Sequence, residues 1–206
     1  MEASLVIVVE GLIGVGKTTL GNILSNELDI PFYSELNNEF TLSMLDKFYK
    51  DKFRWAFSVQ INFLNERFKL LKGIFKTTRR GILDRSLYGD RVFASLLNDS
   101  GYISNYEYKI YLDLLDNMLE HSQRPVLMIY LDCSVDEAER RIKNRNRTFE
   151  TGIPREYLEG LHKKYLSWYD SYNLSPKLRF DYNSINIFDD KHKSRLISFI
   201  KDKLVI

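Results

Sequence analysis

The sequence has little of the features that mark several classes of protein. Its 206 residues include one cysteine, Cys133, so an internal disulfide cannot form and a disulfide-stapled secreted domain is excluded. No apolar run is long enough to span a bilayer, and no signal-peptide pattern is present. We therefore expect a cytoplasmic protein with no membrane partner.

The sequence also has few prolines and glycines, and its net charge is small. With 4 prolines, 10 glycines and no low-complexity stretch, the chain shows no sign of a disordered linker. The formal net charge is only +2, so we expect no bulk attraction to nucleic acid. A length of 206 residues with 44% hydrophobic residues is typical of one sizeable core, and we predict a single domain over residues 1–206.

The clearest motif is a glycine-rich loop that follows an apolar run at residues 5–9 and precedes a helical pattern from Lys17 to about Leu28. Strand, loop and helix in this order match the phosphate-binding loop, whose backbone amides surround phosphate oxygens at a helix N-terminus. Lys17 would reach the β- and γ-phosphates of a bound nucleotide, and Thr18 would place a hydroxyl on Mg²⁺. The residues of this motif that would bind the nucleotide are Gly11, Leu12, Ile13, Gly14, Val15, Gly16, Lys17, Thr18 and Thr19.

The rest of the chain alternates short apolar runs with longer helical patterns. This alternation predicts an α/β fold in which a five-stranded parallel sheet is flanked by helices. The expected strands are 5–9, 30–33, 82–84, 126–132 and 185–188, and the expected helices are 17–28, 42–49, 53–75, a helix from 87, 104–121, a helix from 135, 154–172 and a last helix ending at 204.

Charged residues follow two of the predicted strands at their carboxyl ends, where open parallel sheets bind ligands. Glu35 follows the second strand, and Asp84 and Arg85 follow the third. Asp84 could hold magnesium opposite Thr18, and Arg85 could contact a phosphoryl oxygen or fix a carboxylate base. The alternatives are that Glu35 is a solvated loop acid or belongs to a helix start, and that Asp84 and Arg85 form a helix cap and a surface pair.

Asp132 follows a further strand and is a rival magnesium ligand. Ser134 and Glu137 form a predicted capping box directly after it, and this box favours a turn or cap role for Asp132 instead. The three histidines have no metal-site spacing and are expected to be neutral surface residues.

The predicted helix 53–75 is apolar on nearly every side and is expected to be buried. Gln60 and Arg67 lie two turns apart on one of its faces, with Phe63 between them. They could line a pocket that reads a flat polar ring and stacks it on aromatic side chains. Alternatively, Gln60 caps a neighbouring backbone and Arg67 pairs with Glu66 or another surface acid. Asp90 faces either solvent or the same pocket.

A dense cluster of basic residues follows Glu139. Its arginines lead into a segment with a potential hinge at Gly152, and they belong to a chain that is nearly neutral overall. A charge run is usually a solvated face, but this placement favours an arginine-rich lid over about 141–153 that offsets charge on the transferring phosphoryl group. The arginines of this cluster are Arg140, Arg141, Arg145 and Arg147.

A separate amphipathic helix is predicted after the capping box of Ser104 and Glu107. It carries a packing seam of Leu112, Leu115 and Met118, which we assign to structure or to a dimer interface.

Taken together, four groups of residues resemble the deoxynucleoside kinase family, and in particular its bacterial deoxyadenosine kinases of mycoplasma type. The groups are the phosphate loop, Tyr49 with residues 54–60 and Arg67, the segment 84–91, and the arginine cluster ending in residues 152–158. The resemblance covers most of the chain. It implies a three-layer P-loop kinase fold with an arginine-rich lid, ATP and Mg²⁺ as phosphoryl donor and cofactor, a deoxynucleoside as substrate, and a homodimer.

The resemblance also implies roles for individual residues. Glu35 would be the general base that takes the proton from the 5′-hydroxyl, with Arg85 holding it in place, and Lys17 would complete the catalytic set. Asp84 falls where the family has an acid near the metal. The substrate-binding residues would be Tyr49 and Glu150 at the sugar 3′-hydroxyl and Gln60, Phe63, Arg67 and Asp90 at the base, and the lid arginines at the donor phosphates would be Arg141, Arg145 and Arg147.

Three positions depart from the family pattern. Many relatives have proline where this chain has Leu36, glutamate where it has Asp84, and a second lid glutamate where it has Phe149. The shorter carboxylate of Asp84 in particular would reach magnesium only through a water molecule, so we treat Asp84 as a metal-site candidate.

The chemistry of the base-reading residues favours particular substrates. A carboxylate such as Asp90 only accepts hydrogen bonds and Arg67 only donates them, which matches a ring with an exocyclic amine beside a lone-pair acceptor. Adenine and cytosine both offer this pattern, whereas thymine presents a carbonyl in place of the amine. We expect deoxyadenosine first, then deoxyguanosine or deoxycytidine.

Two other functions are consistent with a phosphate loop. A thymidylate-kinase-like enzyme would share the strand-terminal Asp-Arg and the lid but would phosphorylate a nucleoside monophosphate. A non-catalytic nucleotide switch of the GTPase kind would need an Asn-Lys-x-Asp motif and an Asp-x-x-Gly motif, and the sequence contains neither.

Overall fold

The computed structural model describes residues 4–35, 38–145, 147 and 152–204. Its parallel sheet consists of β1 (Leu5–Gly11), β2 (Phe32–Tyr33), β3 (Arg80–Asp84), β4 (Leu127–Asp132) and β5 (Lys177–Asp181). The helices are α1 (Lys17–Leu28), α2 (Glu39–Lys50), α3 (Lys52–Lys76), α4 (Arg91–Asp99), α5 (Asn105–Glu120), α6 (Val135–Arg145), α7 (Arg155–Ser171) and α8 (Asp190–Leu204), with a 3₁₀ turn at Leu87–Gly89.

The strands pair in the order β2-β3-β1-β4-β5, and every pairing is parallel. β1 lies at the centre, and its apolar residues from Val6 to Val9 are at most 1% exposed. This burial explains why the strand shows no alternation of apolar and polar residues, because helices cover both faces of the sheet.

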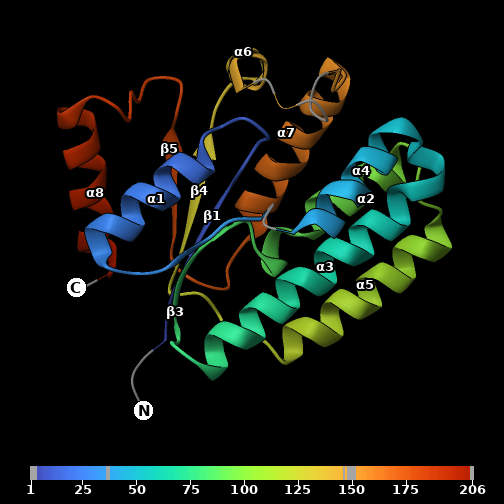
Figure 1. The fold of residues 1–206 in the computed structure, drawn as a ribbon, viewed down its shortest axis with the longest axis horizontal. Helices are drawn as coiled ribbons and strands as arrows, with labels where there is room; N and C mark the ends of the chain where they lie inside the picture. The colour runs from blue at the N-terminus through green and yellow to red at the C-terminus, as the bar shows by residue number, and fades with distance from the viewer. Residues whose placement is uncertain (1–3, 36–37, 146, 148–151, 205–206) are drawn as a thin grey trace.

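The helices form two outer layers around the sheet. Figure 1 shows α1 and α8 on one side of the strands and α3, α4, α5 and α7 on the other. On the second side α3 packs against α5 and α4 packs against α7, while α1 packs against β2 and β3. The predicted fold of a five-stranded parallel sheet flanked by helices is therefore confirmed.

The helix ends follow the local sequence. Ser104 and Glu107 form the predicted capping box at the start of α5. α2 begins at Glu39, earlier than the expected 42, because the side chain of Asn38 accepts a hydrogen bond of 2.6 Å from the Thr41 amide. The predicted helix from 87 is instead a 3₁₀ turn followed by α4.

The predicted last strand at 185–188 is wrong. The fifth strand is Lys177–Asp181, and residues 185–188 lie in the connection to α8. β5 is an edge strand, and only Leu178 is buried in it, so it lacks the continuous apolar run that identified β1 and β4. In this irregular segment Ile187 joins the hydrophobic core and Ile185 packs against it.

The parallel arrangement gathers the chemistry at one edge of the sheet. The glycine-rich loop follows β1, Glu35 follows β2, and Asp84 and Arg85 lie where β3 ends. Because the carboxyl ends of parallel strands meet at the same edge, residues far apart in the chain come together there.

Candidate active site

The glycine-rich loop has a backbone that needs its glycines. Gly11, Gly14 and Gly16 all have positive φ, at 143°, 83° and 109°. A Cβ on Gly14 would lie 2.7 Å from Cγ1 of Ile142 and 2.8 Å from the carbonyl oxygen of Ala138. The loop therefore packs directly against α6, the helix that carries the basic cluster.

Lys17 begins α1 and is buried beneath the loop. Its Nζ donates to the carbonyl oxygens of Leu12 at 2.9 Å and Gly11 at 3.3 Å. Burial lowers the pKa of Lys17 to about 8, with the positive charge of Arg85 acting in the same direction. The ammonium group is therefore held in a site that would favour a negatively charged ligand beside it.

Thr18 and Asp84 face each other across the first turn of α1. The Thr18 hydroxyl donates to Oδ2 of Asp84 at 2.7 Å. The other oxygen, Oδ1, is buried without a hydrogen-bond partner among the described residues, and it lies 4.0 Å from Nζ of Lys17. A hydroxyl and a carboxylate with an unsatisfied oxygen are hard oxygen donors of the kind that Mg²⁺ prefers.

Glu35 is held by two arginines. Nε of Arg85 donates to its Oε2 at 2.9 Å, and an Nη of Arg67 donates to its Oε1. Burial opposes ionisation of Glu35, but the adjacent Arg85 and Arg67 guanidiniums outweigh it and hold its pKa below the ordinary value of 4.5. Glu35 is therefore an ionised carboxylate at neutral pH and is not a solvated loop acid.

Arg85 itself is buried and conformationally constrained. Its φ of 69° lies in the left-handed region that β-carbon-bearing residues seldom adopt. The guanidinium stacks over the ring of Phe93 at 4.5 Å and donates through Nη1 to the Tyr165 hydroxyl. The alternative of a helix cap with a surface pair is excluded for Arg85, because its exposed fraction is 5%.

Asp90 faces inward. It is 1% exposed and forms an ion pair with the guanidinium of Arg67, which also contacts Glu35. Arg67 thus joins the two carboxylates, and Glu66 pairs with Lys69 instead. The guanidinium also lies 5.0 Å above the Phe63 ring, so the cation, the Glu35 carboxylate and the aromatic ring occupy one wall.

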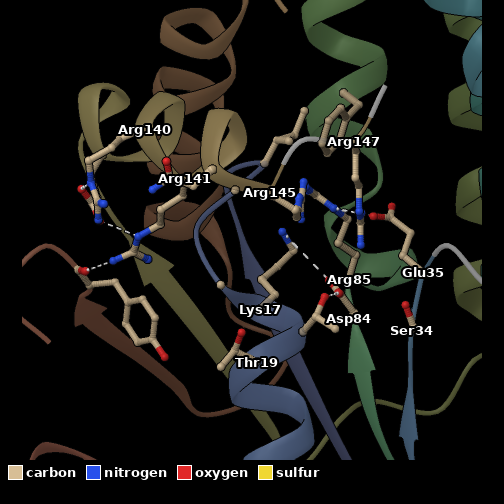
Figure 2. Close-up of a pocket in the computed structure, with 18 of the residues that line it drawn as sticks. Lys17, Thr19, Ser34, Glu35, Asp84, Arg85, Arg140, Arg141, Arg145 and Arg147 are labelled. Carbon is tan, nitrogen blue, oxygen red and sulfur yellow. Dashed lines mark hydrogen bonds and ion pairs between the residues drawn. The ribbon is translucent and has the colours of Figure 1, made fainter. Parts of the chain in front are cut away.

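These side chains line one cavity of about 790 Å³ between the loop, α2, α3 and α6. Figure 2 shows Lys17 and Asp84 at its floor, Arg85 and Glu35 on one side, and Arg141 on the opposite side. Four of the predicted residues that the structure describes do not line the cavity. Asp90 is buried against Arg67, and the other three, Gly11, Leu12 and Val15, are buried at the base of the loop. The predicted residues that line the cavity are Ile13, Gly14, Gly16, Lys17, Thr18, Thr19, Glu35, Tyr49, Gln60, Phe63, Arg67, Asp84, Arg85, Arg141, Arg145 and Arg147.

The basic cluster begins inside α6 and continues past its end. Arg141 donates to the carbonyl oxygens of Val15 and Tyr182, which ties α6 to the loop. Arg145 ends the helix, and Figure 2 shows Arg145 and Arg147 directed into the cavity. Arg140 is more exposed and pairs with Glu137. Glu150, predicted at the sugar, and Phe149 and Leu36 lie outside the described residues.

Some contributions to this site were not predicted. Glu10 ends the apolar run of β1, is 1% exposed, and accepts hydrogen bonds from the Ser86 amide at 2.9 Å and hydroxyl at 3.0 Å. Tyr165 and Tyr157 on α7 also contact or line the site. Glu10 could have been predicted as a site residue, because it is the single charged residue in a buried strand. The two tyrosines have no comparable pattern in the sequence.

Asp132 has neither of its predicted roles. Its carboxylate accepts from Nε and Nη2 of Arg179 at 3.1 and 2.6 Å and lies 3.0 Å from Nε2 of His162. His162, expected at the surface, is therefore partly buried against Asp132. Ser134 accepts from the Glu137 amide, but the Glu137 carboxylate pairs with arginines, so only half of that capping box forms.

Two features are absent from the described residues. No cluster of three or more histidine, cysteine, aspartate or glutamate side chains is arranged to hold a metal ion within this part of the chain. None of the described helices combines the length and apolar character required to cross a membrane.

Comparison with known proteins identifies the class of enzyme that this fold and site define. The family model of deoxynucleoside kinases matches residues 7–205, so the chain belongs to the deoxynucleoside kinase family. The predicted enzyme class is confirmed, and the thymidylate-kinase-like alternative is not favoured.

Individual relatives agree with this assignment. The chain is 40% identical over 161 residues to the deoxyadenosine kinase of Dictyostelium discoideum, a match that covers 77% of this chain and spans 64% of the relative. It is 35% identical to the deoxyadenosine/deoxycytidine kinase of Bacillus subtilis, over 91% of this chain and 87% of the relative. The solved structure of M. mycoides deoxyadenosine kinase with bound dCTP superposes with a TM-score of 0.80 at 30% identity, covering 97% of this chain and 98% of that one.

Proposed function

We propose that this chain transfers the γ-phosphoryl group of ATP to the 5′-hydroxyl of a deoxynucleoside, with deoxyadenosine preferred and deoxyguanosine or deoxycytidine next. One observation carries the proposal. The ionised carboxylate of Glu35, held by Arg85, lines the same cavity as the phosphate-loop lysine, Lys17. Phosphoryl transfer to a hydroxyl requires a base and a phosphate-binding group in the same cavity.

The proposed chemistry is an in-line transfer. Glu35 accepts the proton of the 5′-hydroxyl as the 5′-oxygen bonds to the γ-phosphorus, and the bond from that phosphorus to the bridging oxygen of ADP breaks. Lys17 and the arginines Arg141, Arg145 and Arg147 offset the negative charge on the transferring group. Arg85 keeps Glu35 ionised and oriented, so that positioning and electrostatics supply most of the acceleration.

We further propose that Mg²⁺ accompanies ATP at Thr18 and Asp84. The unsatisfied Oδ1 of Asp84 and the Thr18 hydroxyl that faces this carboxylate fit such an ion. When bound, the ion would neutralise charge on the β- and γ-phosphates. The aspartate is shorter than the glutamate of many relatives, so a water molecule would complete its reach.

Arg67 and Asp90 support the substrate preference. In the structure Arg67 lines the cavity beside Phe63 and Gln60, and its guanidinium forms an ion pair with the buried Asp90. A base with an exocyclic amine could donate to the carboxylate and accept from the guanidinium, while a thymine carbonyl would face an acceptor. Relatives that are named deoxyadenosine kinase and deoxyadenosine/deoxycytidine kinase carry the names of bases of this kind.

Further residue roles and the extent of the domain are part of the same proposal. Tyr49 would bind the sugar 3′-hydroxyl from the cavity wall, together with Glu150. Residues 1–206 would form one kinase domain with a lid at about 141–153, acting in the cytoplasm.

A homodimer is also proposed, and α5 offers a face for it. The predicted seam of Leu112, Leu115 and Met118 packs on the core and is not available. Tyr106, Ile110 and Leu114 lie on the opposite face of the same helix and are 85%, 52% and 38% exposed. An exposed apolar stripe on a helix is typical of a surface covered by a partner.

The experiment that tests the function is a set of initial rates with ATP and Mg²⁺ against the deoxynucleosides and their monophosphates. We expect deoxyadenosine to have the highest kcat/KM and the monophosphates to be inactive as acceptors. Faster phosphorylation of dAMP or dTMP than of any nucleoside would support the thymidylate-kinase-like alternative and overturn the proposal.

A further inference from the structure

A buried hydrogen-bond chain leads from Arg85 to two residues that do not line the cavity, Tyr165 and Glu10. Nη1 of Arg85 donates to the hydroxyl of Tyr165, and that hydroxyl donates to Oε2 of Glu10 at 3.3 Å. Arg85, Tyr165 and Glu10 are 5%, 0% and 1% exposed. Water therefore cannot replace any member of the chain, and each donor depends on the next acceptor.

Glu10 anchors this chain at two points. Its Oε1 accepts from both the amide and the hydroxyl of Ser86, the residue that follows Arg85. A Cβ on Gly89 would lie 2.6 Å from the same oxygen, so the Gly89 backbone packs directly against the buried carboxylate. One carboxylate thus fixes the backbone next to Arg85 and, through Tyr165, the far end of the Arg85 side chain.

The Arg85 backbone needs such an anchor. Its φ of 69° is a left-handed conformation that persists only when the surroundings impose it. The side chain must also present Nε, and not another nitrogen, to Oε2 of Glu35 at 2.9 Å. The Tyr165 hydroxyl occupies Nη1 and leaves Nε directed at Glu35.

We propose that Tyr165, anchored by Glu10, is a positioning residue for phosphoryl transfer that holds the Arg85 guanidinium against Glu35. This inference rests on the proposed function, because it assumes that Glu35 is the base. Tyr165 reaches no cavity-lining position itself, so it acts on the reaction only through Arg85. It lies on α7, which makes this helix a support for the base.

The test compares Tyr165→Phe with Tyr130→Phe. Both rings are 0% exposed and stack on each other at 5.9 Å, so each substitution removes one buried hydroxyl and keeps the ring. The Tyr130 hydroxyl has no hydrogen-bond partner among the described residues, which makes it a matched control. We expect Tyr165→Phe to lower kcat about 10-fold with KM for deoxyadenosine changed less than about 2-fold, and Tyr130→Phe to change neither.

A double-mutant cycle separates positioning from a general loss of structure. Tyr165→Phe should lower kcat much less in an Arg85→Ala background, because its hydroxyl then has no guanidinium to hold. An equal loss in both backgrounds, or an equal loss in Tyr130→Phe, would overturn the proposal.

Two further variants complete the design. Glu10→Gln places an amide donor opposite the Tyr165 hydroxyl and should reproduce the loss of kcat, with thermal unfolding measured in parallel. Glu35→Gln distinguishes the two proposals. Near-normal turnover of Glu35→Gln would overturn the role of Glu35 as the base. If Glu35→Gln has a strongly lowered kcat but Tyr165→Phe retains the wild-type kcat, the positioning role of Tyr165 alone is overturned.

Discussion

Nε of Arg85 lies 2.9 Å from Oε2 of Glu35, although fifty residues separate them in the chain. Glu35 follows the edge strand β2 and Arg85 follows its neighbour β3, so the parallel pairing of the two strands brings the residues together. Arg67 from α3 approaches the same carboxylate from another direction. The base of the proposed reaction is therefore assembled from three elements.

Replacing Glu35 by glutamine should lower kcat by about 10²-fold or more, because the proton of the 5′-hydroxyl then has no acceptor. Deoxyadenosine binding should remain largely intact, as measured by calorimetry. Glu120→Gln on the exposed end of α5 is the control and should retain wild-type turnover. Near-normal turnover of Glu35→Gln would remove this residue from the role of base.

Replacing Asp90 by asparagine should relax the discrimination against thymidine, because the amide can donate to the thymine carbonyl that a carboxylate repels. We expect the ratio of kcat/KM for deoxyadenosine to that for thymidine to fall by about 10-fold or more. Both substrates should be measured with the same enzyme preparation. A ratio equal to that of the wild type would show that Asp90 does not read the base.

The stability of the protein should depend on pH through Glu35. Its pKa is below 4.5 in the folded state because Arg85 and Arg67 outweigh the effect of burial, so the unfolded chain binds its proton more readily. The stabilisation by this carboxylate is present above about pH 4.5 and is lost as the pH falls through the folded-state pKa.

The free energy of unfolding, measured with urea for the wild type and for Glu35→Gln, tests this dependence. The advantage of the wild type should be constant from pH 6 to about pH 5 and should shrink below about pH 4.5. An advantage that grows as the pH is lowered would show that the carboxylate is destabilised by its surroundings.

Replacing Gly14 by alanine should weaken ATP binding and destabilise the fold. The new Cβ would meet Ile142 and the Ala138 carbonyl at under 3 Å, and φ is +83°. We expect a loss of about 1 to 3 kcal/mol in the free energy of unfolding. Gly73→Ala in α3 is the matched control, because a Cβ there meets nothing within 4 Å, and it should stabilise by up to about 1 kcal/mol. Equal effects would contradict the account of the loop.

Much of the fold was predictable because it is encoded locally. The apolar runs of β1 and β4 are unbroken, since both faces of these strands are covered, and the glycine pattern of the loop reflects three positive φ angles. β5 was not found because an edge strand buries little, and the apolar residues Ile185 and Ile187 after it gave a stronger but misleading signal.

The sequence predicts which residues belong to the site better than it predicts which of them contact one another. The strand ends and the spacing on one helix bring Glu35, Arg85 and Arg67 to the same edge, but only the tertiary structure shows that Arg67 joins Glu35 to Asp90. Asp132 was misread because its partner, Arg179, lies on the strand that was itself misplaced.

The most direct test of the central claim follows the labelled γ-phosphate of ATP. Deoxyadenosine and its analogue 2′,5′-dideoxyadenosine, which lacks the 5′-hydroxyl, are offered separately to the enzyme with Mg²⁺. The account predicts that label appears in dAMP with deoxyadenosine and that none is transferred to the analogue. Label transferred to added dAMP, with none passed to deoxyadenosine, would contradict it.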